Sequence, residues 1–507
     1  MATPAHFSYP MRLSPLEGLM PNVYVRQIYC FPTLKPSVVR ILSRGLRGLA
    51  RDVPYILSRL VRDTSGIVVS APCRSPEDLF SRHDLSDSIS YASLQSASFP
   101  PGAFLAPGIS PPEALPRCPA SPAVFAARAT LIDGGLILCV AVHHAVTDIT
   151  GYGALLKIWA SHCHHASSSS ASSSSQDIGF DASWMDRGPL FSASASLSRS
   201  SDPAPLPCLL HIRTPEEEAA RSARRSRSAP EELQTAIFYF PHKRLRALRD
   251  AVNVHVASQG PNSWVSTGDV LSSLLWSAFV EADDAKEDVP DEAARTSTLS
   301  FPVQFRSVLQ PPLPQGFLGA AFLMINAKVP HRDVRLISRP RTSSNSVTPG
   351  QELEAEAQAE AETLATRFDI LALANVALAI RRSTQGIDDA AVREVLGYIE
   401  VHQGVNPEAP LVLGPPRYEA GGSGTSVVSW ADQCVYELDW GNDIGRCDTV
   451  RLSKMGYERD PIVLPRVPGL NGDYGGLEVI MSYEKHTMQK LIESPVMRHL
   501  AVLRCLS

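Results

Sequence analysis

The stretch from residue 124 to residue 142 constrains the fold more than any other part of the sequence. Two strand-like runs, 124–132 and 136–142, flank an Asp-Gly-Gly sequence. A tight turn between antiparallel strands needs a positive φ, which glycine adopts without strain, so the pattern predicts a β-hairpin. The second run is apolar at every position, which indicates a strand buried on both faces. We therefore expect a buried strand that ends abruptly where polar residues begin.

Two histidines and an aspartate follow this strand directly, in the order His143-His144-Ala145-Val146-Thr147-Asp148. Imidazole, with an ordinary pKa of about 6.5, suits proton abstraction near neutral pH. A carboxylate four positions after His144 can fix the turn of the chain or the orientation of the imidazole. The same residues could instead be two satisfied histidines at a strand end, with Asp148 capping the helix that starts near Gly151. From these residues alone, both interpretations stay open.

Three other stretches contain residues that could form a site. Residues 306–319 begin with an arginine and continue through prolines and glycines, which predicts a rigid loop carrying one charged side chain. Trp430 and the Asp-Trp-Gly sequence at 439–441 could serve a site or form a corner of the core. The histidine-rich segment 161–165 has no second ligand pair at finger spacing, so we expect no metal site there.

Composition excludes several classes of function. The chain has 47 Lys and Arg against 52 Asp and Glu, so its formal charge of −5 gives no support to a nucleic-acid partner. The longest apolar run is shorter than the ~18–20 residues of a membrane span, and no signal peptide is visible. Nine cysteines without CxxC spacing indicate reduced thiols. We therefore expect a cytoplasmic protein without a membrane partner. The motifs typical of serine hydrolases, P-loop NTPases and dinucleotide-binding proteins are missing from the sequence.

The length of 507 residues suits two or three domains of ~100–200 residues each. A Ser-rich tract at 166–175 and an Arg-rich stretch at 221–227 cannot bury enough surface to order themselves. We therefore predict an N-terminal domain at 1–200, a linker at 201–234 and a C-terminal domain at 235–507.

Taken together, the stretches at 143–148, at 306–319 and around Asp-Trp-Gly resemble the BAHD acyltransferase family, and more closely its fungal branch typified by trichothecene 3-O-acetyltransferases. Residues 144–148 match the HxxxD motif of the family, 306–319 are similar to its PPLPxGxxG stretch, and 438–445 look like a variant of its DFGWG motif. The resemblance implies an α/β fold with two chloramphenicol-acetyltransferase-like domains, each with a mixed sheet. It also implies a solvent channel between the domains, with the HxxxD histidine at its middle.

The resemblance also implies a role for each matching residue. His144 would be the general base, and Asp148 would pair with an arginine, for which Arg306 is our candidate. Trp430 would lie near the developing oxyanion. The three residues of the DFGWG variant would shape the domain contact on the CoA side of the channel; they are Asp439, Trp440 and Gly441.

The function implied is transfer of an acyl group, acetyl by default, from acyl-CoA to a hydroxyl of a small secondary metabolite. Acyl-CoA would be a co-substrate, no cofactor or metal would be bound permanently, and the protein would be a monomer. The residues that contact CoA are not identified by the sequence. Two alternatives stay open: a relative of condensation domains that takes its acyl group from a carrier protein, since residues 143–148 also fit HHxxxD, and a non-catalytic member that only binds a small ligand.

Overall fold

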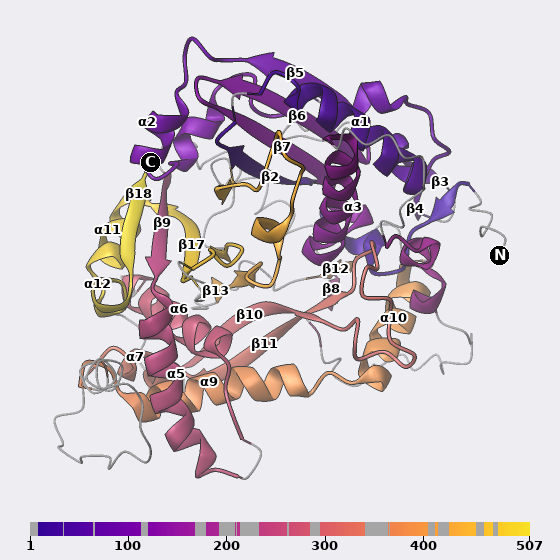
Figure 1. Ribbon diagram of the computed structural model, residues 1–507. Coiled ribbons are helices and arrows are strands. Elements are labelled where there is room, and N and C mark those ends of the chain that lie inside the picture. Colours follow the sequence, from indigo (N-terminus) through magenta and orange to yellow (C-terminus); the bar gives the residue numbers. More distant parts are fainter. Residues whose placement is uncertain are drawn as a thin grey trace.

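The computed structural model describes residues 9–33, 35–63, 66–112, 120–167, 179–191, 208, 210–212, 233–260, 263–283, 295–339, 364, 366–403, 411–413, 425–452, 461–469 and 475–507 (Figure 1). Most of the Ser-rich tract, the Arg-rich stretch and most of the predicted linker lie outside these residues.

Its first sheet is mixed and has five strands in the order β15-β2-β7-β6-β5. The strands are β2 (Tyr24–Phe31), β5 (Phe80–Asp84), β6 (Phe125–Ile132), β7 (Gly135–His143) and β15 (Thr449–Arg451). Only the β5–β6 pair of this sheet is parallel. β6 and β7 form the predicted hairpin, with Ile132 opposite Gly135, and Gly134 takes a φ of +76° in its turn. The hairpin prediction is therefore confirmed.

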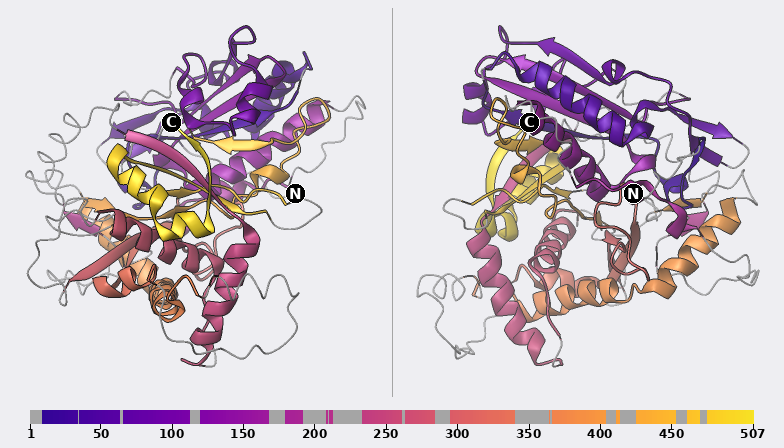
Figure 2. Two further views of the ribbon diagram at one scale, coloured as in Figure 1. Left: turned by 90° about the vertical axis from the view of Figure 1, so that its left-hand side faces the viewer. Right: turned by 45° about the vertical axis from the view of Figure 1, so that its right-hand side comes forward.

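Helices cover both faces of this sheet (Figures 1 and 2). On one face, α3 (Ile149–Ser167) packs against α1 (Val38–Asp52) and places Trp159 edge-on against Phe80 and Phe125. On the other face, α2 (Tyr91–Ser96) contributes to a separate apolar cluster. Alternate residues of β7 serve the two faces, because Ile137 and Cys139 belong to the α2 cluster whereas Leu138 and Val140 belong to the main core. This explains why the strand is apolar at every position.

The second sheet also has five strands, in the order β14-β16-β17-β9-β18. They are β9 (Leu233–Phe240), β14 (Val428–Ser429), β16 (Ile462–Val463), β17 (Leu477–Glu484) and β18 (Val502–Leu506). A third sheet has the order β11-β10-β13, from β10 (Thr296–Gln304), β11 (Phe322–Pro330) and β13 (Thr425–Ser426). The parallel pairs β14–β16 and β10–β13 make both of these sheets mixed.

The described residues contain seven further α-helices (Figure 1). They are α5 (His242–Ala257), α6 (Thr267–Asp283), α7 (His331–Leu336), α9 (Ile370–Gln385), α10 (Asp389–Gln403), α11 (Lys485–Glu493) and α12 (Pro495–Leu500). Two small sheets complete the fold, one from β1 (Met11–Arg12), β3 (Leu60–Asp63) and β4 (Gly66–Val69), the other from β8 (Leu210–Ile212) and β12 (Leu411–Leu413).

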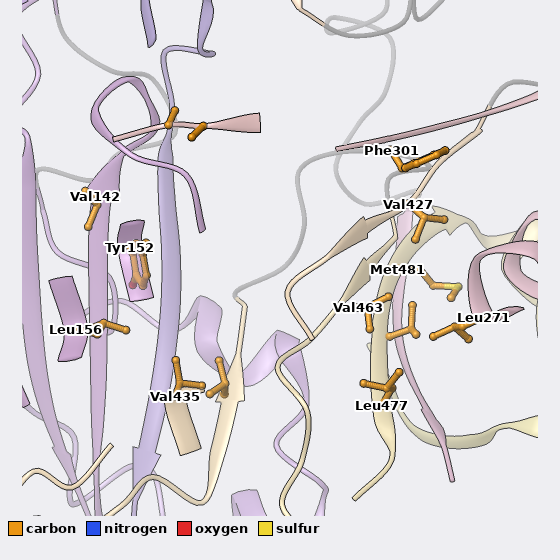
Figure 3. Close-up of a cluster of buried hydrophobic side chains, with 14 of the residues drawn as sticks. Val142, Tyr152, Leu156, Leu271, Phe301, Val427, Val435, Val463, Leu477 and Met481 are labelled. Carbon is orange, nitrogen blue, oxygen red and sulfur yellow. The ribbon is translucent and has the colours of Figure 1, made fainter. Parts of the chain in front are cut away.

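One apolar cluster runs through both halves of the molecule. Figure 3 shows Val142 of β7 and Tyr152 of α3, and Val463 and Met481 on strands of the second sheet. The chain also crosses between the halves, because β15, late in the sequence, pairs with β2 at the edge of the first sheet. The predicted boundaries at 1–200, 201–234 and 235–507 stay a prediction.

Candidate active site

β7 ends at His143, and the next three residues form a short 3₁₀ turn, His144–Val146. His143 is 1% exposed. Its Nδ1 accepts the amide hydrogen of Ala145 at 3.2 Å, which leaves Nε2 to donate to the Asn22 side-chain oxygen at 2.8 Å. Burial, with a smaller contribution from neighbouring His144, lowers the pKa of His143 to about 4. His143 is therefore a neutral, satisfied histidine, as one of the two sequence interpretations described.

His144 differs from its neighbour. The residue as a whole is partly exposed, while its Nδ1 atom is buried and has no hydrogen-bond partner among the described residues. Burial lowers the pKa of His144 below 6.5, against an opposing effect of backbone groups of His144 and Thr147 and of the Asp148 carboxylate. At neutral pH the imidazole is mostly unprotonated, which is the form that can take a proton from a substrate.

Asp148 makes both contacts that the sequence suggested for it. Its two carboxylate oxygens accept from the two terminal nitrogens of Arg306, each at 2.7 Å, and both side chains are buried. Oδ1 also accepts the amide hydrogens of Thr150 and Gly151, which caps α3. Oδ2 accepts the amide hydrogen of Ala321 at 2.8 Å. The predicted pairing of Asp148 with Arg306 is present, and it joins residues 158 positions apart.

These contacts keep Asp148 ionised. Burial acts to raise the pKa of its carboxyl group, but Arg306 and the backbone amides outweigh burial, so the pKa is lowered. Arg306 also donates to the carbonyl oxygens of Phe317 and Gly319 at 3.3 and 2.7 Å. One guanidinium group thus ties the loop after His144 to the far end of the proline-rich stretch.

The Asp-Trp-Gly turn lies at the other end of α3. Trp440 is buried and packs edge-on against Phe31 and Trp159. Gly441 has a φ of +95°, and a Cβ there would meet the backbone of His164 at 3.1 Å. Asp439 accepts the amide hydrogen of Gly441 and faces His164 Nδ1 at 3.4 Å. This turn therefore packs on the end of the helix that begins next to Asp148.

Trp430 follows β14 and packs against an apolar cluster that contains Leu464 and Ile480. Its neighbours Ser429 and Ala431 line a cavity of about 550 Å³. Arg249, Asn253, Trp264, Ser266, the start of α6 and Arg466 also line this cavity. The role of Trp430 at the oxyanion stays a prediction.

Gln433 connects the Trp430 segment to the first sheet. Its side-chain amide exchanges two hydrogen bonds with that of Gln27 in β2, at 2.8 and 3.1 Å. It also lies over Gly153 of α3, where a Cβ would meet the Gln433 side chain at 3.3 Å. The segment after β14 thus spans from the cavity wall to the first turns of α3.

The histidine-rich segment forms the end of α3. His162 pairs with Asp52 of α1 at 2.7 Å, and His164 faces Asp439. Across the described part of the chain, no group of three or more His, Cys, Asp or Glu side chains is placed to hold a metal ion. Among the helices that the structure describes, none is long and apolar enough to cross a membrane.

Two buried residues beside the His144 turn were not singled out from the sequence. Glu17 and Arg187 form a second ion pair, with Nε and Oε1 3.3 Å apart, and Arg187 reaches the carbonyl oxygen of Val146. Neither residue belongs to a recognisable motif, and 170 positions separate them. Their burial and pairing become visible only in three dimensions.

The chain matches two family models. Residues 23–163 match the trichothecene 3-O-acetyltransferase-like N-terminal domain, and residues 113–343 match the transferase family. It is 24% identical to the O-acetyltransferase ptmV of Penicillium ochrochloron, over 98% of this chain and 97% of that protein. It is also 24% identical to the acyltransferase BOA11 of Botryotinia fuckeliana, over 95% of each chain.

Solved structures share the fold. The structure of TRI101 from F. sporotrichioides, in complex with coenzyme A and T-2, superposes with a TM-score of 0.71 at 18% identity and covers 98% of this chain and 100% of that one. Vinorine synthase gives a TM-score of 0.61 at 14% identity, over 99% of this chain and 96% of that one. The expected α/β architecture of two similar domains with mixed sheets is confirmed.

The fold and the matched models define an acyltransferase. More narrowly, the chain is similar to fungal members of the BAHD-type acyltransferase family. The resemblance drawn from its three sequence stretches is confirmed.

Proposed function

We propose that this protein transfers an acyl group, acetyl by default, from acyl-CoA to a hydroxyl group of a small secondary metabolite. Relatives named O-acetyltransferase and the TRI101 complex with coenzyme A and T-2 support the co-substrate and the class of acceptor. The observation that carries the proposal is His144: a partly exposed residue with an unprotonated imidazole at the end of a buried strand, on a turn held by a buried ion pair.

In the proposed reaction, His144 removes the proton from the acceptor hydroxyl. Since Nδ1 is buried, we assign this step to Nε2. The oxygen then attacks the thioester carbonyl, and the tetrahedral intermediate expels CoA thiolate, which takes the proton back from His144. No acyl-enzyme is required when both substrates are held beside the same base.

The other site residues support this step in our proposal. Asp148 and Arg306 fix the turn and do not touch the substrate. Trp430 contributes to stabilising the oxyanion. Asp439, Trp440 and Gly441 shape the domain contact on the CoA side through their packing on α3.

We place the polar end of CoA in the 550 Å³ cavity, because Arg249, Arg466 and the start of α6 line it and can bind phosphate. Two carboxylates also line it, Asp432 and Asp250, and the latter pairs with Arg249 at 2.6 Å. Ser429 and Ala431, which flank Trp430, belong to the same wall. We further propose that a channel between the domains admits the two substrates from opposite ends, and that the protein acts in the cytoplasm as a monomer.

The first experiment measures thiol release from acetyl-CoA by the purified protein with a panel of hydroxylated terpenoids, polyketides and alkaloids. We expect release that depends on the acceptor, together with an acetylated product by mass spectrometry. Transfer only from an acyl carrier protein would favour a condensation-type enzyme. Binding of the compounds without thiol release would favour the non-catalytic alternative.

His144→Ala tests the base directly. We expect loss of transfer, by roughly 100-fold or more, with little change in the thermal midpoint. The control is His165→Ala, an exposed histidine on α3, which should keep full activity. Because the pKa of His144 is lowered, kcat/KM of the wild type should be level above pH 6.5 and fall on acidification below it. Near-full activity of His144→Ala would show that another group is the base.

A further inference from the structure

The Glu17–Arg187 ion pair lies beside the catalytic turn and is completely enclosed. The two side chains are 0% and 3% exposed, and Arg187 Nε lies 3.3 Å from Glu17 Oε1. The guanidinium group also faces the rings of Tyr55 and Phe317, at 5.4 and 5.5 Å from their centroids. A buried pair of this kind is weak evidence for stability by itself, so its contacts must indicate what it does.

Arg187 holds the turn that carries His144. Its Nη2 donates to the carbonyl oxygen of Val146 at 3.1 Å, and its Nη1 donates to that of Met185 at 2.8 Å. Val146 is the last residue of the 3₁₀ turn that begins at His144. The guanidinium group therefore fixes the backbone two residues after the base.

Glu17 holds the loop that precedes β11. Its Oε2 accepts the amide hydrogen of Ser14 at 2.8 Å, and its Oε1 accepts that of Ala320 at 3.3 Å. Gly319 lets it approach this closely, since a Cβ there would lie 2.7 Å from Glu17 Oε1. Each charge of the pair is thus satisfied by backbone groups as well as by its partner.

The Glu17–Arg187 pair and the Asp148–Arg306 pair bind neighbouring residues of the same loop. Ala320 donates to Glu17 and the next residue, Ala321, donates to Asp148. The ring of Phe317 lies between the two guanidinium groups, at 5.5 Å from Arg187 and 5.7 Å from Arg306. Asp148 fixes the chain after the turn, and Arg187 fixes the turn itself.

We propose that Glu17 and Arg187 are positioning residues for the transfer reaction, acting through the Val146 carbonyl to orient His144. The Nδ1 atom of His144 has no hydrogen-bond partner among the described residues, so no side chain fixes the ring by a bond to that nitrogen. The direction of the imidazole then depends on the backbone of its turn, which the two pairs hold from both sides. The inference rests on the proposed function for the identity of the reaction.

Arg187→Met is the main test, with acetyl-CoA and an acceptor found in the thiol-release assay. It removes the donor to Val146, and a misplacement of about 1 Å at the base can lower the rate by roughly 100-fold. We expect kcat to fall by about that factor, with KM for acetyl-CoA within about threefold of the wild type. Arg187→Lys, which keeps the positive charge but not the planar guanidinium group with its several donors, should recover part of kcat.

The matched control is Arg451→Met. Arg451 forms an equally buried pair with Glu478, at 2.6 Å, which joins β15 to β17. We expect this variant to lose thermal stability and keep kcat per folded molecule. If Arg187→Met also loses only stability, the pair is structural and the inference is wrong.

A readout that needs no turnover separates this inference from the proposed function. In protein with ¹³C-labelled histidine rings, the His144 signal is assigned from His144→Ala. We expect Arg187→Met or, if it does not fold, Glu17→Gln to shift the His144 ring signals and their titration, whereas Arg451→Met leaves them unchanged. An unshifted His144 signal in a folded variant overturns the inference, even if the wild type transfers acetyl. If the wild type transfers nothing, the proposed function fails while the ring signals still decide this point.

Discussion

The two ends of α3 are held by different physical means. At its start, Asp148 binds Arg306 in a pair whose side chains are 5% and 7% exposed. At its end, Trp440 packs between aromatic rings, the contact of Asp439 with His164 is about half exposed, and His162 pairs with Asp52 of α1. A buried ion pair needs specific partners in a specific geometry, whereas apolar packing stabilises the fold and tolerates small shifts of the side chains. We therefore expect changes at the start of the helix to lower both activity and stability, and changes at its end to lower stability alone.

The largest effect is expected for Asp148→Ala at the start of the helix. It leaves the Arg306 guanidinium buried without its counterion and should lower the free energy of unfolding by about 3–5 kcal/mol, measured by urea denaturation. Transfer should fall as well, because the cap of α3 and the contact with Ala321 are lost. The double variant Asp148→Leu/Arg306→Met should regain stability but not activity. Full activity of a folded Asp148→Ala protein would contradict the comparison.

Trp440→Ala should lower the free energy of unfolding by a similar amount without lowering the rate of acyl transfer. Removing a fully buried indole typically costs roughly 3–5 kcal/mol, and the ring here touches Phe31 and Trp159. Activity per folded molecule, measured well below the thermal midpoint, should stay near the wild-type value. Trp440→Phe should lose less, because it keeps an aromatic contact. A large fall in kcat of folded Trp440→Ala would show that the two ends are not distinct.

Asp439→Ala should have the smallest effect. Exposed ion pairs contribute about 0–1 kcal/mol, and the Asp439 and His164 side chains are 49% and 44% exposed. We expect a shift in the free energy of unfolding below about 1 kcal/mol and unchanged transfer. Asp439→Asn, which keeps an acceptor for the Gly441 amide, is the conservative comparison. A loss as large as that of Asp148→Ala would mean that this contact is buried in solution.

The sequence was sufficient where a local pattern carried the information. The two strand-like runs and the Asp-Gly turn predicted the hairpin, since both strand faces and the turn glycine are short-range features. The resemblance then predicted the pairing of Asp148 with Arg306, although they are far apart in the chain. The burial of both faces of β7 could be predicted because every residue from 136 to 142 is apolar.

Other features depend on long-range packing and could not be predicted. His143 and His144 are adjacent, and only the structure shows that Asn22 and the Ala145 amide satisfy the first. It also shows that Nδ1 of the second has no hydrogen-bond partner among the described residues. Glu17 and Arg187 have no motif and meet across 170 positions. β15 has three residues, too few for a periodic pattern to mark it as a strand of the first sheet.

That short strand has a consequence for how the protein is made. β15 covers the edge of β2, and its last residue is Arg451. During synthesis the chain emerges from its N-terminus, so β2 leaves the ribosome long before its neighbour exists. Until then, an unpaired strand edge can join a strand of another chain. Expression of the first half alone exposes this edge permanently, and aggregation of that fragment in the cell is the expected result.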